Sequence, residues 1–319
     1  MAEAPPIEVR GLVKRYGEIT AVDEVDLTVN AGDVFGYLGP NGAGKTTSLR
    51  MMLGLIRPTA GSVRLFGRDP QLSVSALRGV AGFVEAPSFY PYLSGRANLE
   101  LCAALDGAGD KQIDEVLETV ELRDRAKDKV KGYSHGMKQR LGIASALLRN
   151  PRLLLLDEPA TGLDPAGMRD MRELVRDLGR RGITVLLSSH QMMEVEELCN
   201  RVAIIRSGRV AYEGSLAELR SRSGISYRLR TSDDERAKDV CLSQPGIDDV
   251  AEAPSIGLTF TAADESAVAG LSIALAQSDI PVLELTPRQA TLEDLFFELT
   301  EGDGPRAPAG DAKVIEKVA

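Results

Sequence analysis

Short apolar segments separated by glycines open the chain. Residues 7–38 contain three segments rich in β-branched and aliphatic side chains: IEVRGL, AVDEVDLTV and DVFGYL. This pattern predicts hairpins that lead into a buried strand. A helix is expected to begin at Gly44 and to end near Gly54, ahead of a proline. The glycine-rich stretch that follows, up to about residue 85, predicts turns.

The middle of the chain changes from helices to alternating strands and helices. Residues 94–150 follow a mostly helical pattern that ends at Pro151, which predicts a helical insert within an α/β domain. From residue 152 the order is strand, helix, strand, helix: RLLLLD, PAGMRDMRELVRDLGRRG, ITVLLSS and QMMEVEELC. This order implies parallel strands covered by helices. A hairpin that turns at Ser207 and Gly208 follows.

A second unit begins after a short helix that runs into a Ser/Gly/Arg linker. Its segments follow the order βαββαβα, which predicts a small two-layer α+β domain. We therefore expect a first domain over 5–220, with a helical subdomain at about 86–150. A C-terminal accessory domain is expected over 221–300, followed by a flexible Gly/Pro/Ala-rich tail over 301–319.

Composition and charge narrow the functional classes. The 319 residues give a formal net charge of −9, which argues against a broad, sequence-independent grip on nucleic acid. The three cysteines are scattered and odd in number, which favours free thiols in a reducing cytosol. The N-terminal segment has no apolar stretch behind a basic start, and the longest aliphatic run is Leu153–Leu156. We therefore expect a cytosolic chain that does not itself cross a membrane, since spanning takes about 20 apolar residues.

A glycine-rich loop between a predicted strand and a predicted helix fits the pattern G-x-x-x-x-G-K-[ST]. Glycines let backbone N–H groups wrap phosphate oxygens, and the helix N-terminus adds partial positive charge. Lys45 supplies a point charge for the β- and γ-phosphates, and the Thr46 hydroxyl can ligate Mg²⁺. The alternative is a plain glycine-rich turn. The predicted nucleotide-binding residues here are Gly39, Pro40, Asn41, Gly42, Ala43, Gly44, Lys45, Thr46 and Thr47.

Two carboxylates follow the aliphatic segment Leu153–Leu156. Open α/β sheets place ligands at the carboxyl ends of their strands, which is where Asp157 and Glu158 are expected. Adjacent acids repel each other, so a cation or a catalytic task is expected there. Asp157 is the candidate for holding Mg²⁺, and Glu158 is the candidate general base that polarises the attacking water.

Between these two elements lies the segment Tyr133–Arg140, directly ahead of a helix. Ser134 is a good N-cap residue, and Gly136 leaves room for a ligand to approach the free N–H groups of the helix. When this segment is taken alone, a capped helix with no ligand is the better explanation.

The order and spacing of these motifs resemble the nucleotide-binding subunit of ATP-binding cassette transporters over about residues 5–220. The resemblance implies an α/β fold: a P-loop ABC ATPase domain with a mainly parallel core sheet, an antiparallel β subdomain and a helical subdomain, together with the small C-terminal α+β domain. It also implies the ligands ATP and Mg²⁺. In that family the counterparts of Ser134, His135 and Gly136 complete the ATP site of the opposite subunit. Two copies are therefore expected to close head to tail around two ATP molecules.

Three further positions match family elements. Tyr16 matches the aromatic residue that stacks on adenine, against the alternative of a surface tyrosine. Asp164, in the Gly-Leu-Asp-Pro segment, resembles the loop that links the two sites and also caps the next helix. His190 matches the switch histidine that contacts the γ-phosphate and the attacking water. A satisfied buried histidine is the alternative there, and it competes more strongly at His135.

Departures from the usual family pattern point to a subgroup. Glu85 stands where the family usually has Gln; it can still ligate the metal, but its charge responds to Mg²⁺ and pH. His135 and Met137 replace the commoner Gly and Gln. These residues resemble the cassettes of bacitracin-resistance and lantibiotic-immunity exporters. The C-terminal unit resembles the extension of daunorubicin-type cassettes, with Leu292–Phe297 matching their closing motif; a plain amphipathic helix is the alternative there.

The sequence therefore predicts an ATP hydrolase that powers a membrane exporter of an antibiotic or antimicrobial peptide. Glu158 and His190 would position water for in-line attack, while Lys45, Thr46 and Asp157 with Mg²⁺ would spread the developing charge. The expected partners are a separately encoded permease and a second copy of the chain, at the cytoplasmic face of the membrane, with no nucleic acid. The alternatives are a soluble cassette ATPase that acts on nucleic acid or ribosomes, and a P-loop kinase or GTPase.

Overall fold

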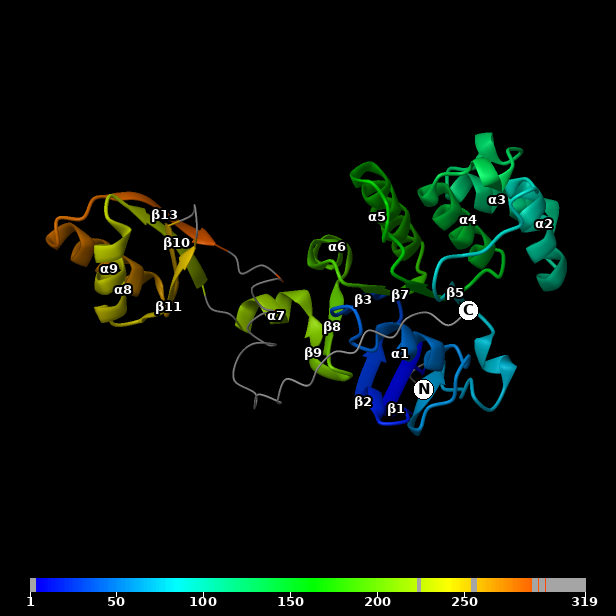
Figure 1. Ribbon diagram of the computed structural model, residues 1–319, viewed down its shortest axis with the longest axis horizontal. Coiled ribbons are helices and arrows are strands. Elements are labelled where there is room, and N and C mark those ends of the chain that lie inside the picture. The colour runs from blue at the N-terminus through cyan, green and yellow to red at the C-terminus, as the bar shows by residue number, and fades with distance from the viewer. Residues whose placement is uncertain (1–3, 223–224, 254–256, 289–291, 293–295, 297–319) are drawn as a thin grey trace.

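The computed structural model describes residues 4–222, 225–253 and 257–288, together with positions 292 and 296. Figure 1 shows an N-terminal α/β domain and a separate C-terminal domain that lies beyond α7. Among the described residues, no helix combines the length and the apolar character that crossing a bilayer requires.

A six-stranded sheet forms the centre of the N-terminal domain, with the strand order β5-β6-β7-β3-β8-β9. The first five of these strands are mutually parallel, and β9 pairs antiparallel with β8. That last pair is the expected hairpin, which turns at Ser207 and Gly208 with positive φ at both residues. The strands are β3 (Val34–Leu38), β5 (Val80–Phe83), β6 (Leu153–Asp157), β7 (Thr184–Ser189), β8 (Arg201–Arg206) and β9 (Arg209–Ser215).

The central sheet is buried on both faces because two apolar layers pack against it. Along β6, Leu153 and Leu155 belong to one buried cluster, and Leu154 and Leu156 belong to the other. Helix α1 lies in the first layer, and the helices α4, α5 and α6 lie in the second. This double covering explains the uninterrupted aliphatic segment in the sequence. The helices that accompany the sheet are α1 (Lys45–Met52), α5 (Pro165–Arg180), α6 (Met192–Leu198) and α7 (Leu216–Arg222).

A three-stranded antiparallel sheet, ordered β2-β1-β4, packs over α1. It comprises β1 (Ile7–Tyr16), β2 (Ile19–Val29) and β4 (Ala60–Leu65). The prediction of turns up to about residue 85 was wrong, because this stretch contains β4, β5 and the 3₁₀ helix η1 (Val74–Leu77). Its glycines serve close backbone packing: a Cβ added at Gly82 would lie 1.9 Å from the carbonyl oxygen of Leu155 in the neighbouring strand.

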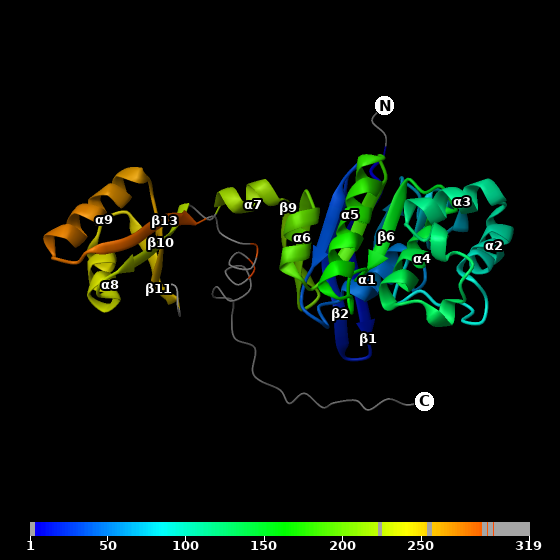
Figure 2. The ribbon, with the colours of Figure 1, turned by 90° about the horizontal axis from the view of Figure 1, so that it is seen from above.

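The predicted helical insert forms three helices at the end of the domain away from α7 (Figure 2). Ser94 caps α2 and Ser134 caps α4, and each accepts a hydrogen bond from the backbone N–H three residues further on. The helices are α2 (Gly95–Asp106), α3 (Asp110–Thr119) and α4 (His135–Leu147), with the 3₁₀ turns η2 (Arg123–Arg125) and η3 (Val130–Gly132) between the last two.

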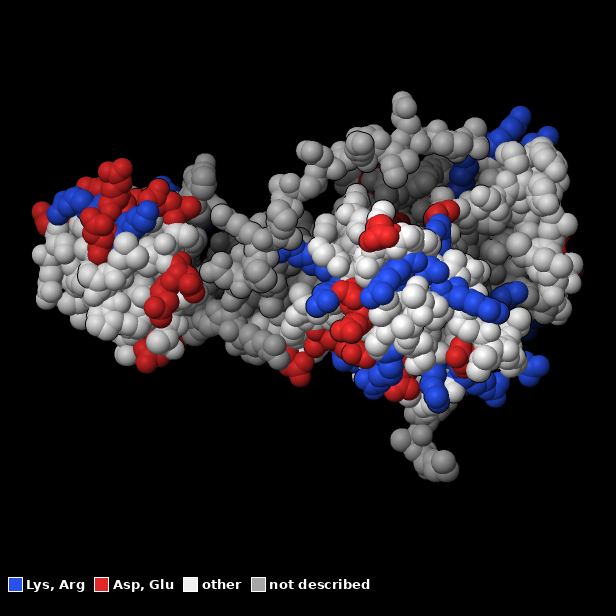
Figure 3. Space-filling view, turned by 60° about the horizontal axis from the view of Figure 1, so that its bottom comes forward, with Lys and Arg blue, Asp and Glu red and all other residues white. Residues whose placement is uncertain are grey.

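The C-terminal domain is a four-stranded antiparallel sheet, ordered β11-β12-β10-β13, that packs on two helices. It has its own core, which includes Leu229, Phe260 and Leu271. Acidic residues outnumber basic ones between residues 225 and 288, and Figure 3 shows red side chains over much of this domain. The elements are β10 (Ile225–Thr231), α8 (Asp234–Ser243), β11 (Ile247–Ala253), β12 (Gly257–Ala262), α9 (Glu265–Gln277) and β13 (Val282–Arg288).

Two residues of the predicted closing motif return to the N-terminal domain. Leu292 and Phe296 are buried in its second apolar layer, the one that also contains Tyr212, Leu216 and Leu219. The rest of that motif and the predicted tail lie outside the described residues.

Candidate active site

The predicted phosphate loop connects β3 to α1, and two of its glycines are required by the fold itself. Gly44 has φ 102°, and a Cβ there would lie 2.3 Å from the carbonyl oxygen of Ala21. A Cβ at Gly39 would lie 2.4 Å from the carbonyl oxygen of Ile205. Because side chains are excluded at both positions, the backbone of the loop stays open to a phosphate approaching the first turn of α1.

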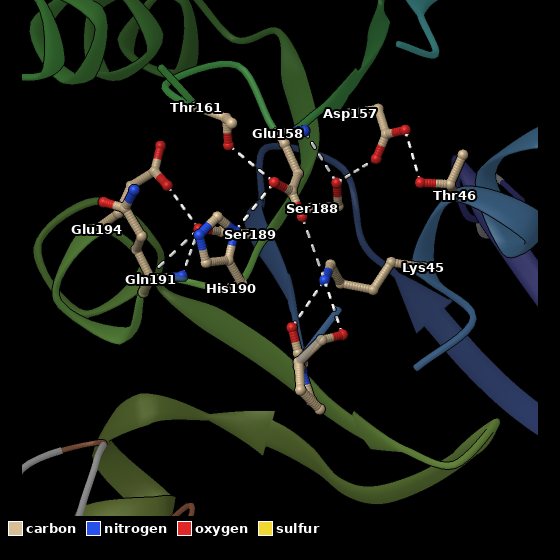
Figure 4. A network of polar contacts seen from close by, with 12 residues as sticks. Lys45, Thr46, Asp157, Glu158, Thr161, Ser188, Ser189, His190, Gln191 and Glu194 are labelled. Atoms are coloured by element: carbon tan, nitrogen blue, oxygen red, sulfur yellow. Dashed lines mark hydrogen bonds and ion pairs between the residues drawn. The ribbon is translucent and has the colours of Figure 1, made fainter. Parts of the chain in front are cut away.

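Lys45 is the first residue of α1, and its side chain is only 5% exposed. Its Nζ donates hydrogen bonds to the carbonyl oxygens of Gly39 and Pro40, at 2.7 and 3.1 Å. The same Nζ lies 3.2 Å from Oε1 of Glu158 (Figure 4). A buried ammonium needs such partners, and they place the charge between the loop and the carboxylate.

Oxygen atoms suited to a divalent cation converge beside Lys45. Thr46 Oγ1 donates to Asp157 Oδ2 at 2.9 Å, and Ser188 Oγ donates to Asp157 Oδ1 at 2.5 Å. A hydroxyl and a carboxylate are hard ligands of the kind Mg²⁺ takes together with waters and phosphate oxygens. The donor set of Thr46 and Asp157 therefore fits this ion.

Glu158 follows directly after β6 and has φ 48°, a conformation that turns its side chain out of the strand. Its Oε2 accepts hydrogen bonds from Thr161 Oγ1 at 2.8 Å and from His190 Nδ1 at 2.9 Å. Burial raises the pKa of Glu158, but the Thr161 hydrogen bond and the Lys45 charge outweigh it and leave the pKa below its ordinary value. The carboxylate is thus held ionised, with both oxygens oriented.

His190 is fixed by the same carboxylate. An ionised carboxylate can only accept, so Nδ1 carries a proton and Nε2 is left for another partner. The preceding residue, Ser189, holds the backbone beside His190 in place. Its carbonyl accepts from the Gly39 N–H at 3.2 Å, and its Oγ donates to Glu194 Oε2 at 2.6 Å. Burial raises the pKa of Glu194, and the hydrogen bond from Ser189 only partly offsets this.

The predicted third metal ligand lies elsewhere. Glu85 follows β5 with φ 71°, and its carboxylate forms an ion pair with Arg50 of α1. Arg50 lies one helical turn after Thr46 on the same face of α1. Thus the structure brings Thr46 and Asp157 together, while the carboxylate of Glu85 is paired with Arg50.

The segment around Ser134 lies on a different part of the surface. Ser134 Oγ accepts from the Met137 N–H at 3.2 Å, and the ring of His135 donates from Nε2 to the carbonyl oxygen of Thr161 at 3.1 Å. A Cβ at Gly136 would meet only Leu163, at an ordinary 3.5 Å. The fold itself therefore does not require glycine there. A cavity of about 530 Å³ opens here, and its lining includes Ser134, His135, Gly136 and Asp164.

Two remaining predicted residues lie at the margins. The ring of Tyr16 is 47% exposed at the end of β1, with Lys14 Nζ 5.0 Å from its centroid. Asp164 caps α5 by accepting from the Gly167 N–H at 3.0 Å, and Pro165 follows it as expected.

The structure thus joins five predicted residues in one polar network: Lys45, Thr46, Asp157, Glu158 and His190 (Figure 4). Tyr16 and Glu85 lie outside it. Sequence reasoning missed four polar residues that support the network: Thr161, Ser188, Ser189 and Glu194. A signal existed for Ser188 and Ser189, because polar residues at the carboxyl end of β7 lie beside the acids that end β6.

Comparison with known proteins places this geometry in a family. The profile of the family described as ABC transporter matches residues 22–161. The chain is 40% identical to the bacitracin transport ATP-binding protein of Bacillus licheniformis over 299 residues, which cover 93% of this chain and 97% of that protein. It is 35% identical to the daunorubicin/doxorubicin resistance ATP-binding protein of Streptomyces peucetius, with 98% of each covered.

Solved structures agree with the sequence relatives. The ATP-binding subunit of an ABC transporter superposes with a TM-score of 0.61 at 29% identity, covering 68% of this chain and 92% of that one. A dimeric ATP-binding cassette in a post-hydrolysis state, bound to ADP and Pi, gives a TM-score of 0.59 at 27% identity, covering 66% and 98%. The expected fold class is confirmed, and the chain belongs to the ATP-binding cassette family, as an ATP-hydrolysing subunit of an ABC transporter.

Proposed function

We propose that the chain powers the export of an antibiotic or antimicrobial peptide through a separately encoded membrane permease. The observation that carries the proposal is the extent of the likeness to transport and resistance proteins. The bacitracin and daunorubicin relatives align over nearly their whole length, so the likeness includes the C-terminal domain. A likeness confined to the ATPase domain would favour no particular transporter class.

The polar network supports a division of roles in ATP hydrolysis. Glu158, held ionised by Thr161 and Lys45, accepts a proton from the attacking water. His190, oriented through its Nδ1, presents Nε2 toward the γ-phosphate and the water. Lys45 and the N–H groups of the loop bind the phosphates. Mg²⁺, when bound by Thr46 and Asp157, supplies further positive charge to the β- and γ-phosphates.

Two copies of the chain would complete each other's sites. Ser134, His135 and Gly136 line an open cavity away from Lys45, and their N–H groups begin a helix. This arrangement suits the phosphates of an ATP held by another copy. The dimeric cassette among the structural neighbours supports the assignment. The exposed ring of Tyr16 is available to stack on adenine.

The permease would dock beside Glu85. The segment that follows Glu85 exposes Tyr90 and Tyr92, whose side chains are 54% and 63% accessible. Exposed aromatic rings are typical of binding surfaces. Docking there would place the chain on the cytoplasmic face of the membrane as a peripheral subunit. Contact with the permease would also reach α1 directly through the Arg50–Glu85 pair.

Drug resistance in a sensitive bacterium tests the proposal. We expect the chain and its permease, expressed together, to raise the inhibitory concentration of a bacitracin-type peptide or an anthracycline. The Lys45→Ala chain, expressed at the same level with the same permease, is expected to give no protection. Equal sensitivity with and without the wild-type chain across both compound classes would contradict export of this kind.

The alternative, a soluble cassette ATPase acting on nucleic acid or ribosomes, gains no support from the relatives named above. The formal net charge of −9 also works against a broad grip on phosphate backbones. Salt-sensitive binding of the purified chain to ribosomes would favour this alternative instead.

A further inference from the structure

A pair of hydrogen bonds connects Ser134–Gly136, here called the signature segment, to the carboxylate of Glu158 in the same chain. His135 Nε2 donates to the carbonyl oxygen of Thr161 at 3.1 Å. The hydroxyl of Thr161 donates to Glu158 Oε2 at 2.8 Å. One residue, Thr161, therefore contacts both: its backbone faces the segment that serves the opposite ATP, and its side chain orients the base that serves its own.

The segment between Glu158 and Asp164 is a tight turn that transmits displacements. The Thr161 N–H donates to the Glu158 carbonyl at 3.1 Å, and the Leu163 N–H donates to the Ala160 carbonyl at 3.2 Å. Gly162 has φ 77°, and a Cβ added there would lie 3.4 Å from His135 Nε2. The imidazole thus lies against the turn itself. The carbonyl and the hydroxyl that make these two contacts belong to one residue, so a displacement of the Thr161 Cα moves both of them.

The contact depends on the histidine side chain. Ser134 directs its Oγ to the Met137 N–H within its own helix, and Gly136 has no side chain. A glycine at position 135, the commoner residue of the signature, has no group that could reach Thr161. The link is therefore a property of this chain's own signature sequence.

We propose that His135 is a positioning residue that sets the orientation of Glu158 in its own chain through Thr161. When the signature segment moves against the ATP bound by the opposite copy, the movement would thereby shift Glu158, which acts on the ATP bound by its own chain. The inference rests on the proposed function, since it requires two ATP sites shared between two copies. It names a route for coupling them.

Two substitutions of the same chemistry but different reach test the contact. In His135→Gln the amide nitrogen takes the place of Nε2 and can still donate to Thr161. In His135→Asn it takes the place of Nδ1 and falls short. We expect kcat for ATP to be about three- to tenfold lower in His135→Asn than in His135→Gln, as for loss of one hydrogen bond.

Mixed dimers separate positioning from direct contact with ATP. One chain carries Glu158→Gln, so that it binds ATP but leaves hydrolysis to its partner, and the two chains carry different affinity tags. His135→Asn is then placed either in the hydrolysing chain or in the Glu158→Gln chain. We expect the fall in kcat only when it lies in the hydrolysing chain, in cis to the working Glu158. A fall confined to the other arrangement, where His135 faces the ATP being cut, would overturn the proposal.

A second measurement guards against a merely structural effect. In a Thr161→Val background the hydroxyl is already absent, so adding His135→Asn is expected to lower kcat by less than twofold further. Full additivity of the two losses would overturn the link through Thr161. A wild-type dimer that hydrolyses no ATP would instead contradict the proposed function, because that function requires ATP hydrolysis.

Discussion

The phosphate-loop region and the signature region of this chain are built in opposite ways. Around the phosphate loop, Lys45 and Asp157 are 5% and 7% exposed, and each has its hydrogen-bond partners inside the same chain. Around the signature, Ser134 and His135 are exposed on the wall of an open cavity. The first region is preorganised before any ligand arrives, and the second is open to solvent.

Under the proposed function, this difference suits the two regions to different tasks. Charges that stabilise a transition state act best when they are fixed and shielded from water, which is what the network of Lys45, Asp157 and Glu158 provides. A surface that binds and releases a second copy in each cycle must pay little to become exposed again, so polar helix-capping residues suit it. Four substitutions test the comparison, beginning with the largest expected effect.

Glu158→Gln removes the proposed general base of the phosphate-loop region. The amide keeps the shape of the side chain but cannot accept the proton of the water, so we expect kcat to fall about 10²- to 10⁴-fold. ATP binding and ATP-dependent dimer formation are expected to persist. Phosphate release and size-exclusion chromatography with ATP measure the two properties. A turnover close to wild type would remove Glu158 from this role.

Lys45→Ala separates binding from hydrolysis. Loss of the ammonium removes charge-assisted contacts to the phosphates, and we expect ATP affinity to fall about 10- to 100-fold in titrations with a fluorescent ATP analogue. Lys111→Ala is the matched control, because its side chain is 93% exposed on α3 and affinity is expected to stay unchanged. Equal affinities for the three proteins would argue against the phosphate-loop assignment.

Gly136→Ala sharpens the comparison on the signature side. The fold accommodates the added methyl, which meets only Leu163 at 3.5 Å, so the melting temperature is expected to stay within about 2 °C of wild type. ATPase activity is expected to fall about tenfold, because the methyl intrudes on the ATP held by the other copy. ATP affinity of the single chain is expected to remain normal. Weakened binding by the single chain would place Gly136 in its own site.

Glu194→Gln probes the layer beneath the phosphate-loop region and has the smallest expected effect. Burial raises the pKa of Glu194 in the folded chain, so the folded state holds this proton more tightly than the unfolded state does. Its contribution to stability is fully present below the unfolded pKa and is lost as pH rises through the folded pKa. We therefore expect the melting temperature of wild type, relative to Glu194→Gln, to fall as pH rises.

The size of that change is expected to stay below about 4 °C, the shift that 1 kcal/mol produces in a domain of this size. Scanning calorimetry of both proteins from pH 4 to pH 8 measures it. Parallel curves for the two proteins would show that Glu194 keeps the same pKa on unfolding.

Sequence patterns predicted the elements that are marked by a run or a period of apolar side chains. The residues of β6 and β7 are all buried, and their aliphatic runs predicted strands. Strands β4 and β5 were missed because they contain glycines, which the patterns indicate as turns. Gly61, with φ 80° and a Cβ position 2.1 Å from the Gly11 carbonyl oxygen, shows that backbone packing required the glycine there. Such packing depends on neighbours that sequence patterns do not contain.

The candidate site divides along the same line. Lys45, Thr46, Asp157 and Glu158 fall within short motifs whose chemistry can be argued from residue type and spacing. The contact of Thr161 with Glu158 depends on the positive φ at Glu158, and the Arg50–Glu85 pair joins residues 35 positions apart. Neither contact follows from a local pattern. The structure shows where these side chains lie, and the roles of all the predicted site residues stay predictions.

The return of Leu292 and Phe296 to the N-terminal domain has a mechanical consequence. A domain joined by a single linker can rotate freely about it, whereas a second attachment restricts that rotation. The C-terminal sheet is preceded in the chain by α7 and followed by these two side chains, and both belong to the same buried cluster. Movement of the C-terminal sheet would therefore be transmitted to α7 and β9. A chain cut at residue 222 would lose Leu292 and Phe296 and expose the apolar side chains that they cover.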